Sequence, residues 1–187
     1  MTSSVLIRQA ARTIWAGGIV AYPTEGVYGL GCLPGNVATV ERLLHLKSRS
    51  AAAGLILIAA DLRQLDQWIQ PDSKEIRRLR QARKQAITWI VGARPDTPNW
   101  LTGEQQTLAV RITDHPLAAA LCRAADTALV STSANLSGRA PALTALGVRR
   151  RFGRALDYIL GGTVGPNRGL ATEIRRARNN SVVRPSR

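Results

Sequence analysis

The amino-acid sequence predicts an α/β fold: a single domain, residues 1–187, built on a twisted, open, mixed sheet with flanking helices. Two observations carry this prediction. Helical patterns with a period near 3.6 alternate with short apolar runs from end to end, and no repeat, linker or break in composition divides the chain. With 187 residues, 45% of them hydrophobic and 20% charged, the chain can bury a core without disulfides or metals. Disordered, collagen-like and mini-protein classes are excluded.

Helices are predicted where apolar residues recur on one face behind a capping residue. The first begins at Ser3 or Ser4 and ends at Gly17-Gly18, and its apolar residues are Val5, Leu6, Ala10, Ile14 and Trp15. The second follows the cap Asn36, and its apolar stripe is Val37, Val40, Leu43 and Leu44. Further helices are expected over residues 61–69, capped by Asp61, from residue 71 into the basic stretch 77–84, and over residues 116–125.

Short apolar runs bounded by turn residues predict buried strands at residues 19–22, 54–58, 87–91, 108–112 and 128–130. The glycine-rich run 26–31 follows the first strand. Its order, G-x-x-G-x-G, is neither the Rossmann nor the P-loop fingerprint, and a glycine-assisted turn is the plain alternative to a ligand site. The tail from Val148 receives no element. It carries Arg149, Arg150, Arg151, Arg154, Arg168, Arg175, Arg176, Arg178, Arg184 and Arg187.

The charge balance points to an anionic partner. The chain has 26 Lys and Arg residues against 12 Asp and Glu, a formal net charge of +14, and such an excess attracts phosphorylated small molecules and RNA alike. The longest apolar run, residues 55–60, is far too short for a membrane span. Cys32 and Cys122 have neither disulfide nor metal-ligand spacing. A cytoplasmic protein is therefore predicted.

Three polar segments are candidates for a site. Thr24 and Glu25 follow the first strand, in the region where open α/β sheets bind ligands. Lys47 and Arg49 could converge on a polyphosphate, although cations at a helix C-terminus also complement the helix dipole. Residues 131–138, STSANLSG, place three hydroxyls and a carboxamide directly after a strand, where they would hold phosphate oxygens or cap the next helix.

Arg111 is the least ordinary single residue, because a guanidinium in an apolar strand needs an anion or a cleft. If it binds a ligand carboxylate or phosphate, replacing it should spare the fold. If it neutralises an internal Asp or Glu instead, replacing it should destabilise the fold. Ser-His-Asp, HExxH and metal-cluster patterns are missing from the sequence.

Several motifs resemble those of the YrdC-like family, the threonylcarbamoyl-AMP synthases, in their short bacterial form. They are AYPTEGVYGLGC (21–32), LLHLKSR (43–49), GLILIAA (54–60), TPNWLTG (97–103), LAVRITDHPL (108–117) and LVSTSANLSG (129–138). The sequence departs from the family at Ser50, Ala53 and residues 83–86, where a proline, a nucleotide-contacting residue and a WPGP-like turn are usual.

The resemblance implies a YrdC-like fold and the synthesis of threonylcarbamoyl-AMP and pyrophosphate from L-threonine, bicarbonate and ATP. Mg²⁺ would be held mostly by the nucleotide, without a dedicated protein site. The product would serve the threonylcarbamoylation of the adenosine 3′ of the anticodon in ANN-reading tRNAs, by the complex of TsaD, TsaB and TsaE. Thr24, Arg111 and Ser131 would contact threonine. Nucleotide contacts would come from Lys47, Arg49, Ser133, Asn135 and Arg184, with Lys47 and Arg49 as the catalytic pair.

The net charge, the arginine-rich tail and the departures also permit a rival function: an RNA-binding or ribosome-maturation protein of the same fold with reduced or lost catalysis. The chain has only eight Phe, Trp and Tyr residues, scattered along its length, whereas single-strand RNA binders interleave aromatic with basic side chains.

Overall fold

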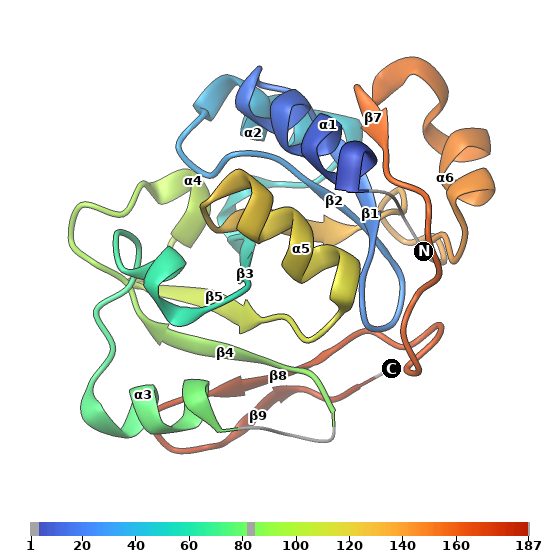
Figure 1. Cartoon of the computed structure of the whole chain (residues 1–187). Coiled ribbons are helices and arrows are strands. Elements are labelled where there is room, and N and C mark those ends of the chain that lie inside the picture. The colour runs from blue at the N-terminus through green and yellow to red at the C-terminus, as the bar shows by residue number, and fades with distance from the viewer. Residues whose placement is uncertain (1–3, 82–84, 187) are drawn as a thin grey trace.

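A computed structural model describes residues 4–81 and 85–186, and within them it shows a nine-stranded mixed sheet with flanking helices (Figure 1). The strand order is β7-β1-β2-β6-β3-β5-β4-β8-β9. The neighbours β1–β7, β3–β5 and β4–β8 run parallel, and the other neighbours run antiparallel. The prediction of an α/β fold with an open mixed sheet is confirmed.

The strands are β1 (Val20–Pro23), β2 (Tyr28–Gly31), β3 (Ile56–Ala59), β4 (Ile87–Gly92), β5 (Thr107–Ile112), β6 (Leu129–Ser133), β7 (Tyr158–Ile159), β8 (Glu173–Arg176) and β9 (Val182–Arg184). The helices are α1 (Ser4–Trp15), α2 (Val37–Leu46), α3 (Ser73–Arg80), α4 (Asn99–Thr102), α5 (Pro116–Ala125) and α6 (Ala145–Phe152). Single 3₁₀ turns form at Ala51–Ala53, Leu62–Leu65 and Gly153–Ala155.

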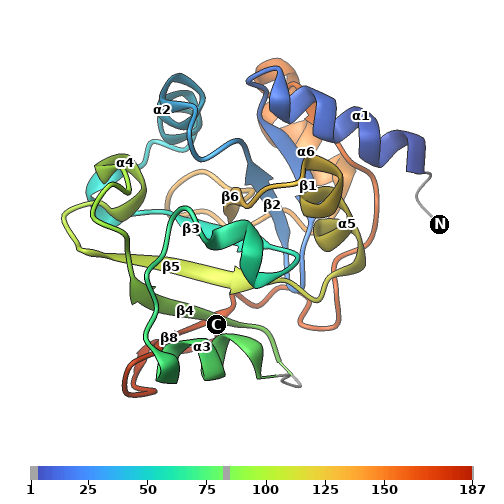
Figure 2. The ribbon, with the colours of Figure 1, turned by 60° about the vertical axis from the view of Figure 1, so that its left-hand side comes forward.

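Two apolar clusters lie against the sheet, and the alternation of side chains along β1 separates them. Val20 and Tyr22 pack in the cluster that receives α1 and α5, whereas Ala21 packs in the larger cluster that receives α2 and α6. Helices α1 and α5 lie side by side over one face of the sheet (Figure 1). Helix α3 lies beside β8, at the end of the molecule opposite α1 (Figure 2).

Local capping explains where the helices begin. The Asn36 Oδ1 accepts a hydrogen bond from the Thr39 N–H at 3.1 Å, and Asp72 forms a full capping box with Glu75 at the start of α3. The predicted 116–125 helix is α5, which His115 caps. Asp61 caps only the 3₁₀ turn Leu62–Leu65, so the helix predicted to reach residue 69 is shorter than expected. The predicted cap Ser3, Arg83 and Lys84 in the departure at 83–86, and Arg187 lie outside the described residues.

Three sequence-based expectations need correction. The glycine-rich run is not only a turn, because its second half is β2, a strand between β1 and β6. Glycine suits it, since a Cβ on Gly31 would lie 2.5 Å from the Val130 carbonyl oxygen. The tail contains the second half of α6 and three strands, none of which is predicted by the sequence pattern. The apolar face of α1 is also narrower than expected, because Val5 and Trp15 are 57% and 60% exposed.

Candidate functional site

A pocket of about 550 Å³, part of it open to solvent, lies where the β1–β2 connection meets β5, β6 and the segment before β8. It contains six of the eight residues that the sequence singled out: Thr24, Arg49, Arg111, Ser131, Ser133 and Arg184. The other lining residues are Gly26, Val27, Gly29, Ile56, Thr132, Leu170, Ala171 and Thr172. Residues far apart in the sequence therefore meet in one place, as the motifs predicted.

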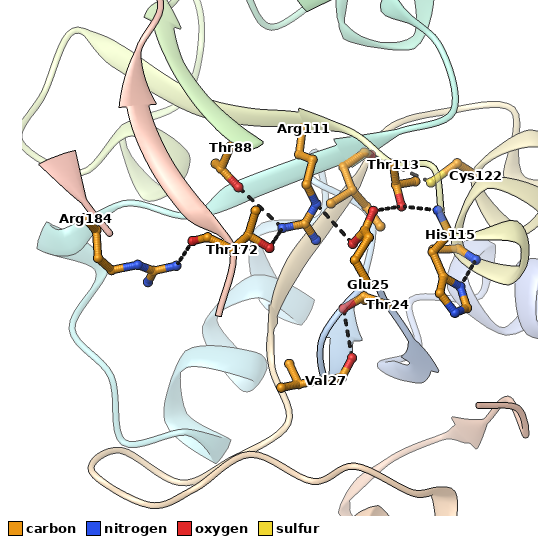
Figure 3. A network of polar contacts seen from close by, with 12 residues as sticks. Thr24, Glu25, Val27, Thr88, Arg111, Thr113, His115, Cys122, Thr172 and Arg184 are labelled. Atoms are coloured by element: carbon orange, nitrogen blue, oxygen red, sulfur yellow. Dashed lines mark hydrogen bonds and ion pairs between the residues drawn. The ribbon is translucent and has the colours of Figure 1, made fainter. Parts of the chain in front are cut away.

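Arg111 projects from β5 into a polar environment, although it is only 6% exposed (Figure 3). Its Nη1 donates hydrogen bonds to Thr172 Oγ1 at 2.9 Å and to Thr88 Oγ1 at 3.3 Å. Its Nε lies 3.5 Å from Glu25 Oε2 in an ion pair. The structure thus combines the two hypotheses for Arg111, a ligand-binding residue and the partner of an internal carboxylate. Arg111 lines a pocket and also faces Glu25.

Glu25 is fixed from its other side. The Thr113 hydroxyl donates a hydrogen bond to Glu25 Oε1 at 2.5 Å. The same Thr113 Oγ1 accepts a hydrogen bond from the His115 N–H at 3.3 Å. Burial would raise the pKa of the Glu25 carboxyl, but the Arg111 charge and the Thr113 hydroxyl outweigh it and hold the pKa below its ordinary value. The carboxylate is therefore charged at neutral pH.

Two further arginines reach the pocket. Arg49 Nη2 donates to the Gly54 carbonyl at 3.0 Å, and its Nη1 lies 3.5 Å from Thr132 Oγ1. Arg184 Nη2 donates to the Thr172 carbonyl at 2.8 Å. The described lining residues thus include three guanidinium groups and no carboxylate, a combination that favours anionic ligands.

Lys47 and Asn135 are not among the lining residues, but both contact Ser133, which is. The Lys47 ammonium is buried and donates hydrogen bonds to the Ser133 carbonyl, to the Asn135 carbonyl at 2.7 Å and to Asn135 Oδ1 at 3.2 Å. The same Oδ1 accepts the Ser133 hydroxyl at 2.6 Å. Lys47 and Asn135 therefore hold the backbone that presents Ser133 to the pocket.

The sequence reasoning missed the pocket wall formed by Leu170, Ala171 and Thr172. Thr172 accepts hydrogen bonds from two arginines: its hydroxyl oxygen accepts one from Arg111, and its backbone carbonyl accepts one from Arg184. No motif marks this segment, since threonine, alanine and leucine are ordinary in any loop. Gly26 was a usable signal, because it allows the loop over residues 167–170 to lie against the β1–β2 connection.

Gly26→Ala tests this close approach. A Cβ on residue 26 would lie 2.1 Å from the Leu170 carbonyl oxygen, so the hydrogen bond from the Gly169 N–H to the Gly26 carbonyl, 2.8 Å long, must open. We expect a stability loss of about 1–3 kcal/mol in thermal melting, together with weaker binding of pocket ligands. Gly161→Ala is the control, since a Cβ there meets no described atom within 4 Å. Equal behaviour of the two variants would contradict the packing argument.

Two kinds of feature are missing from the part of the chain that the structure covers, namely a cluster of metal ligands and a helix long and apolar enough to span a membrane. Over residues 4–81 and 85–186, no three His, Cys, Asp or Glu side chains are grouped so that they could hold a metal ion. None of the helices in these ranges has the length and apolar character that a membrane span requires. Cys32 and Cys122 are both buried free thiols.

Comparison with known sequences supports the resemblance. The profile of the Sua5/YciO/YrdC family, which carries the description "telomere recombination", matches residues 12–186. A threonylcarbamoyl-AMP synthase of Nitrosococcus oceani is 54% identical over 179 residues, which cover 95% of this chain and 96% of the relative. The synthase of Halorhodospira halophila is 48% identical over 95% of this chain and 93% of its own. The synthase of Pseudomonas putida is 44% identical over 99% of this chain and 100% of its own.

Solved structures agree with this assignment. The structure of P. abyssi Sua5 complexed with L-threonine superposes with a TM-score of 0.90 at 28% identity, covering 98% of this chain and 55% of that longer one. E. coli YciO, at 24% identity, shares the fold with a TM-score of 0.82 over 98% of this chain and 90% of its own. The predictions of family, fold and enzyme class are confirmed. The chain belongs to the Sua5/YciO/YrdC family and, within it, to the threonylcarbamoyl-AMP synthases, which are nucleotidyltransferases.

Proposed function

We propose that this chain condenses L-threonine, bicarbonate and ATP to threonylcarbamoyl-AMP and pyrophosphate in the pocket of Arg49, Arg111 and Arg184. One observation carries the proposal: three guanidinium groups meet there with the hydroxyls of Thr24, Ser131 and Thr132 and no lining carboxylate. A carboxylate and a triphosphate are the anions such a set recognises. The similarity to a Sua5 that binds L-threonine supports the choice of amino acid.

The residue roles follow from position. Thr24, Arg111 and Ser131 lie together and would hold threonine, with Arg111 on its carboxylate. Arg49, Ser133 and Arg184 would contact the nucleotide. Lys47 and Asn135 would serve the nucleotide site through the Ser133 backbone that they hold, rather than by direct contact. This division assigns each predicted site residue a task compatible with its hydrogen bonds.

The chemistry needs no protein nucleophile. The amino nitrogen of threonine forms a bond to the carbon of bicarbonate, and a C–O bond breaks with loss of water, which gives N-carboxythreonine. Its carboxylate oxygen then forms a bond to the α-phosphorus of ATP while the bond to the bridging oxygen of pyrophosphate breaks. The arginines would neutralise charge on the reacting and leaving oxygens and align them. The described lining residues include no carboxylate that could hold Mg²⁺, and Mg²⁺ would enter bound to the nucleotide phosphates.

The product would pass to a transferase complex of TsaD, TsaB and TsaE in the cytoplasm, for threonylcarbamoylation of adenosine next to the anticodon of tRNA. Residues 1–187 would act as one domain, since the sheet is continuous from β7 to β9. The RNA-binding alternative stays a prediction, and we assign it no binding site. Exposed arginines occur both on α6 and around β8, so their distribution does not favour one face of the protein for RNA.

A pyrophosphate-release assay tests the proposed reaction. The protein, incubated with ATP, Mg²⁺ and fresh bicarbonate, is expected to release pyrophosphate when threonine is added and not when it is omitted. Omitting bicarbonate should also stop release, because no carbamate can form. The absence of pyrophosphate with all substrates present would refute the proposal.

A further inference from the structure

Glu25 has no task in the reaction described so far, yet it is the carboxylate placed against the pocket's central arginine. It is 7% exposed and is not among the residues that line the pocket, whereas Arg111 is. We therefore consider an effect on binding that passes through a neighbour. That neighbour is Arg111, whose Nε lies 3.5 Å from Glu25 Oε2 (Figure 3).

The contacts of Arg111 fix its orientation. Glu25 faces the Nε edge, and the hydroxyls of Thr88 and Thr172 accept hydrogen bonds from Nη1. Within the described residues, Nη2 forms no hydrogen bond or ion pair of its own. The Glu25 carboxylate acts on Nε through its charge, since neither Nε nor Glu25 Oε2 forms a hydrogen bond with any described residue. Because the guanidinium group is planar and rigid, this ion pair and the two hydrogen bonds of Nη1 set the direction of Nη2. The contacts thus leave Nη2 available to a ligand in the pocket that Arg111 lines.

Glu25 is itself rigidly held. Thr113 Oγ1 donates to its Oε1 at 2.5 Å, and the Glu25 carbonyl accepts the Asn167 N–H at 3.2 Å. The chain on both sides is also tied, since the Thr24 carbonyl accepts the Gly165 N–H at 2.9 Å. Because the Glu25 carboxylate is anchored in this way, it can orient the Arg111 side chain that lines the pocket without contacting a ligand itself.

We propose that Glu25 is a positioning residue for threonine: its buried carboxylate holds the Arg111 guanidinium at the angle at which Nη2 meets the substrate carboxylate. The inference rests on the proposed function, in which Arg111 binds that carboxylate. The negative charge also compensates Arg111 in the empty pocket, so the arginine stays in place when no anion is bound. Glu25 thereby affects threonine and leaves the nucleotide untouched.

Glu25→Gln is the first test, with steady-state kinetics for both substrates. We expect the threonine KM to rise about tenfold, the size of an ordinary coupling between contacting charged groups, while the KM for ATP stays unchanged. Glu25→Asp keeps the charge but shortens the reach, and it should restore part of the threonine affinity. Glu75→Gln is the matched control, because Glu75 is also 7% exposed but caps α3 away from the pocket.

A double-mutant cycle separates positioning from a general loss of structure. If Glu25 acts through Arg111, Glu25→Gln adds nothing to the threonine KM in an Arg111→Ala background. An equal tenfold rise in both backgrounds would overturn the proposal, and so would an unchanged threonine KM in Glu25→Gln. If Glu25→Gln does not fold, Glu25→Asp replaces it in the same cycle. Its effect on the threonine KM is then compared between the wild-type and the Arg111→Ala backgrounds.

The failure of the proposed function gives a different result. An Arg111→Ala variant that folds and keeps the wild-type threonine KM would remove Arg111 from the threonine site, and the role of Glu25 would fall with it. A raised threonine KM in Arg111→Ala with no effect of Glu25→Gln would overturn the role of Glu25 alone. Threonine binding measured by calorimetry without ATP provides a readout independent of turnover.

Discussion

Arg111→Ala is expected to weaken threonine binding about tenfold to a hundredfold, the value of a charge-assisted hydrogen bond of about 1.5–3 kcal/mol. ATP binding should change little, because Arg49 and Arg184 remain. We also expect a stability loss of about 3–5 kcal/mol, since removing one partner leaves the buried Glu25 carboxylate without its counterion. Calorimetric titration with threonine and thermal melting of the same sample measure the two effects.

The structure thus changes what the sequence alone predicted for this residue. An anion-binding arginine was expected to be dispensable for the fold, but its pairing with Glu25 couples fold and site. The Arg111→Ala/Glu25→Gln double variant is the control, because it removes both charges and should recover part of the lost stability without recovering threonine binding. Arg111→Lys should rescue threonine binding only in part, since a point charge cannot form two parallel bonds to a carboxylate. A large melting loss with unchanged threonine binding would refute the ligand role.

Lys47→Met is expected to lower kcat/KM for ATP about a hundredfold, the penalty of a small displacement of a binding group. The Ser133 and Asn135 carbonyls and Asn135 Oδ1 would lose their shared donor. Leaving such acceptors unmet also costs about 1–3 kcal/mol of stability. Steady-state kinetics and thermal melting test both effects, with the exposed Lys74→Met as the control. Normal ATP kinetics in Lys47→Met would contradict the role of Lys47 in holding the loop.

The same lysine predicts a pH dependence. Burial, helped by the charge of Arg49, lowers the pKa of Lys47 from 10.5 to about 8. Above pH 8 the neutral amine keeps two N–H donors for three acceptors, so the KM for ATP should rise from pH 8 upward, and Lys47→Met should lack this rise.

A loss of stability caused by the titration of Lys47 cannot explain a rise of the KM for ATP above pH 8. The unfolded chain, with the higher pKa, binds more protons between pH 8 and 10.5, so this group makes stability increase with pH in that window. A falling melting temperature that paralleled the rising KM would therefore point to a different titrating group.

The predictions that held from sequence rest on local physics. Asn36 and Asp72 cap helices through side chains that reach only two or three residues along the chain. The apolar runs that became β4 and β5 needed no partner to be recognised, because strand patterns are read within a few residues. The motifs around Thr24, Arg49, Arg111 and Ser131 indicated one site, and the fold places all four in one pocket.

The sequence by itself determined the α/β class, the family, and six of the polar residues that line the pocket, since each is encoded in short patterns. Only the tertiary structure decided that Arg111 faces Glu25, 86 positions before it in the chain, and that Lys47 bonds to backbone atoms of residues 133 and 135. It also decided that Thr172, in the arginine-rich tail, joins the predicted Arg184 in the pocket wall. The physical reason is that ion pairs and hydrogen bonds depend on the spatial distance and angle between groups, which the order of residues along one strand or loop does not contain.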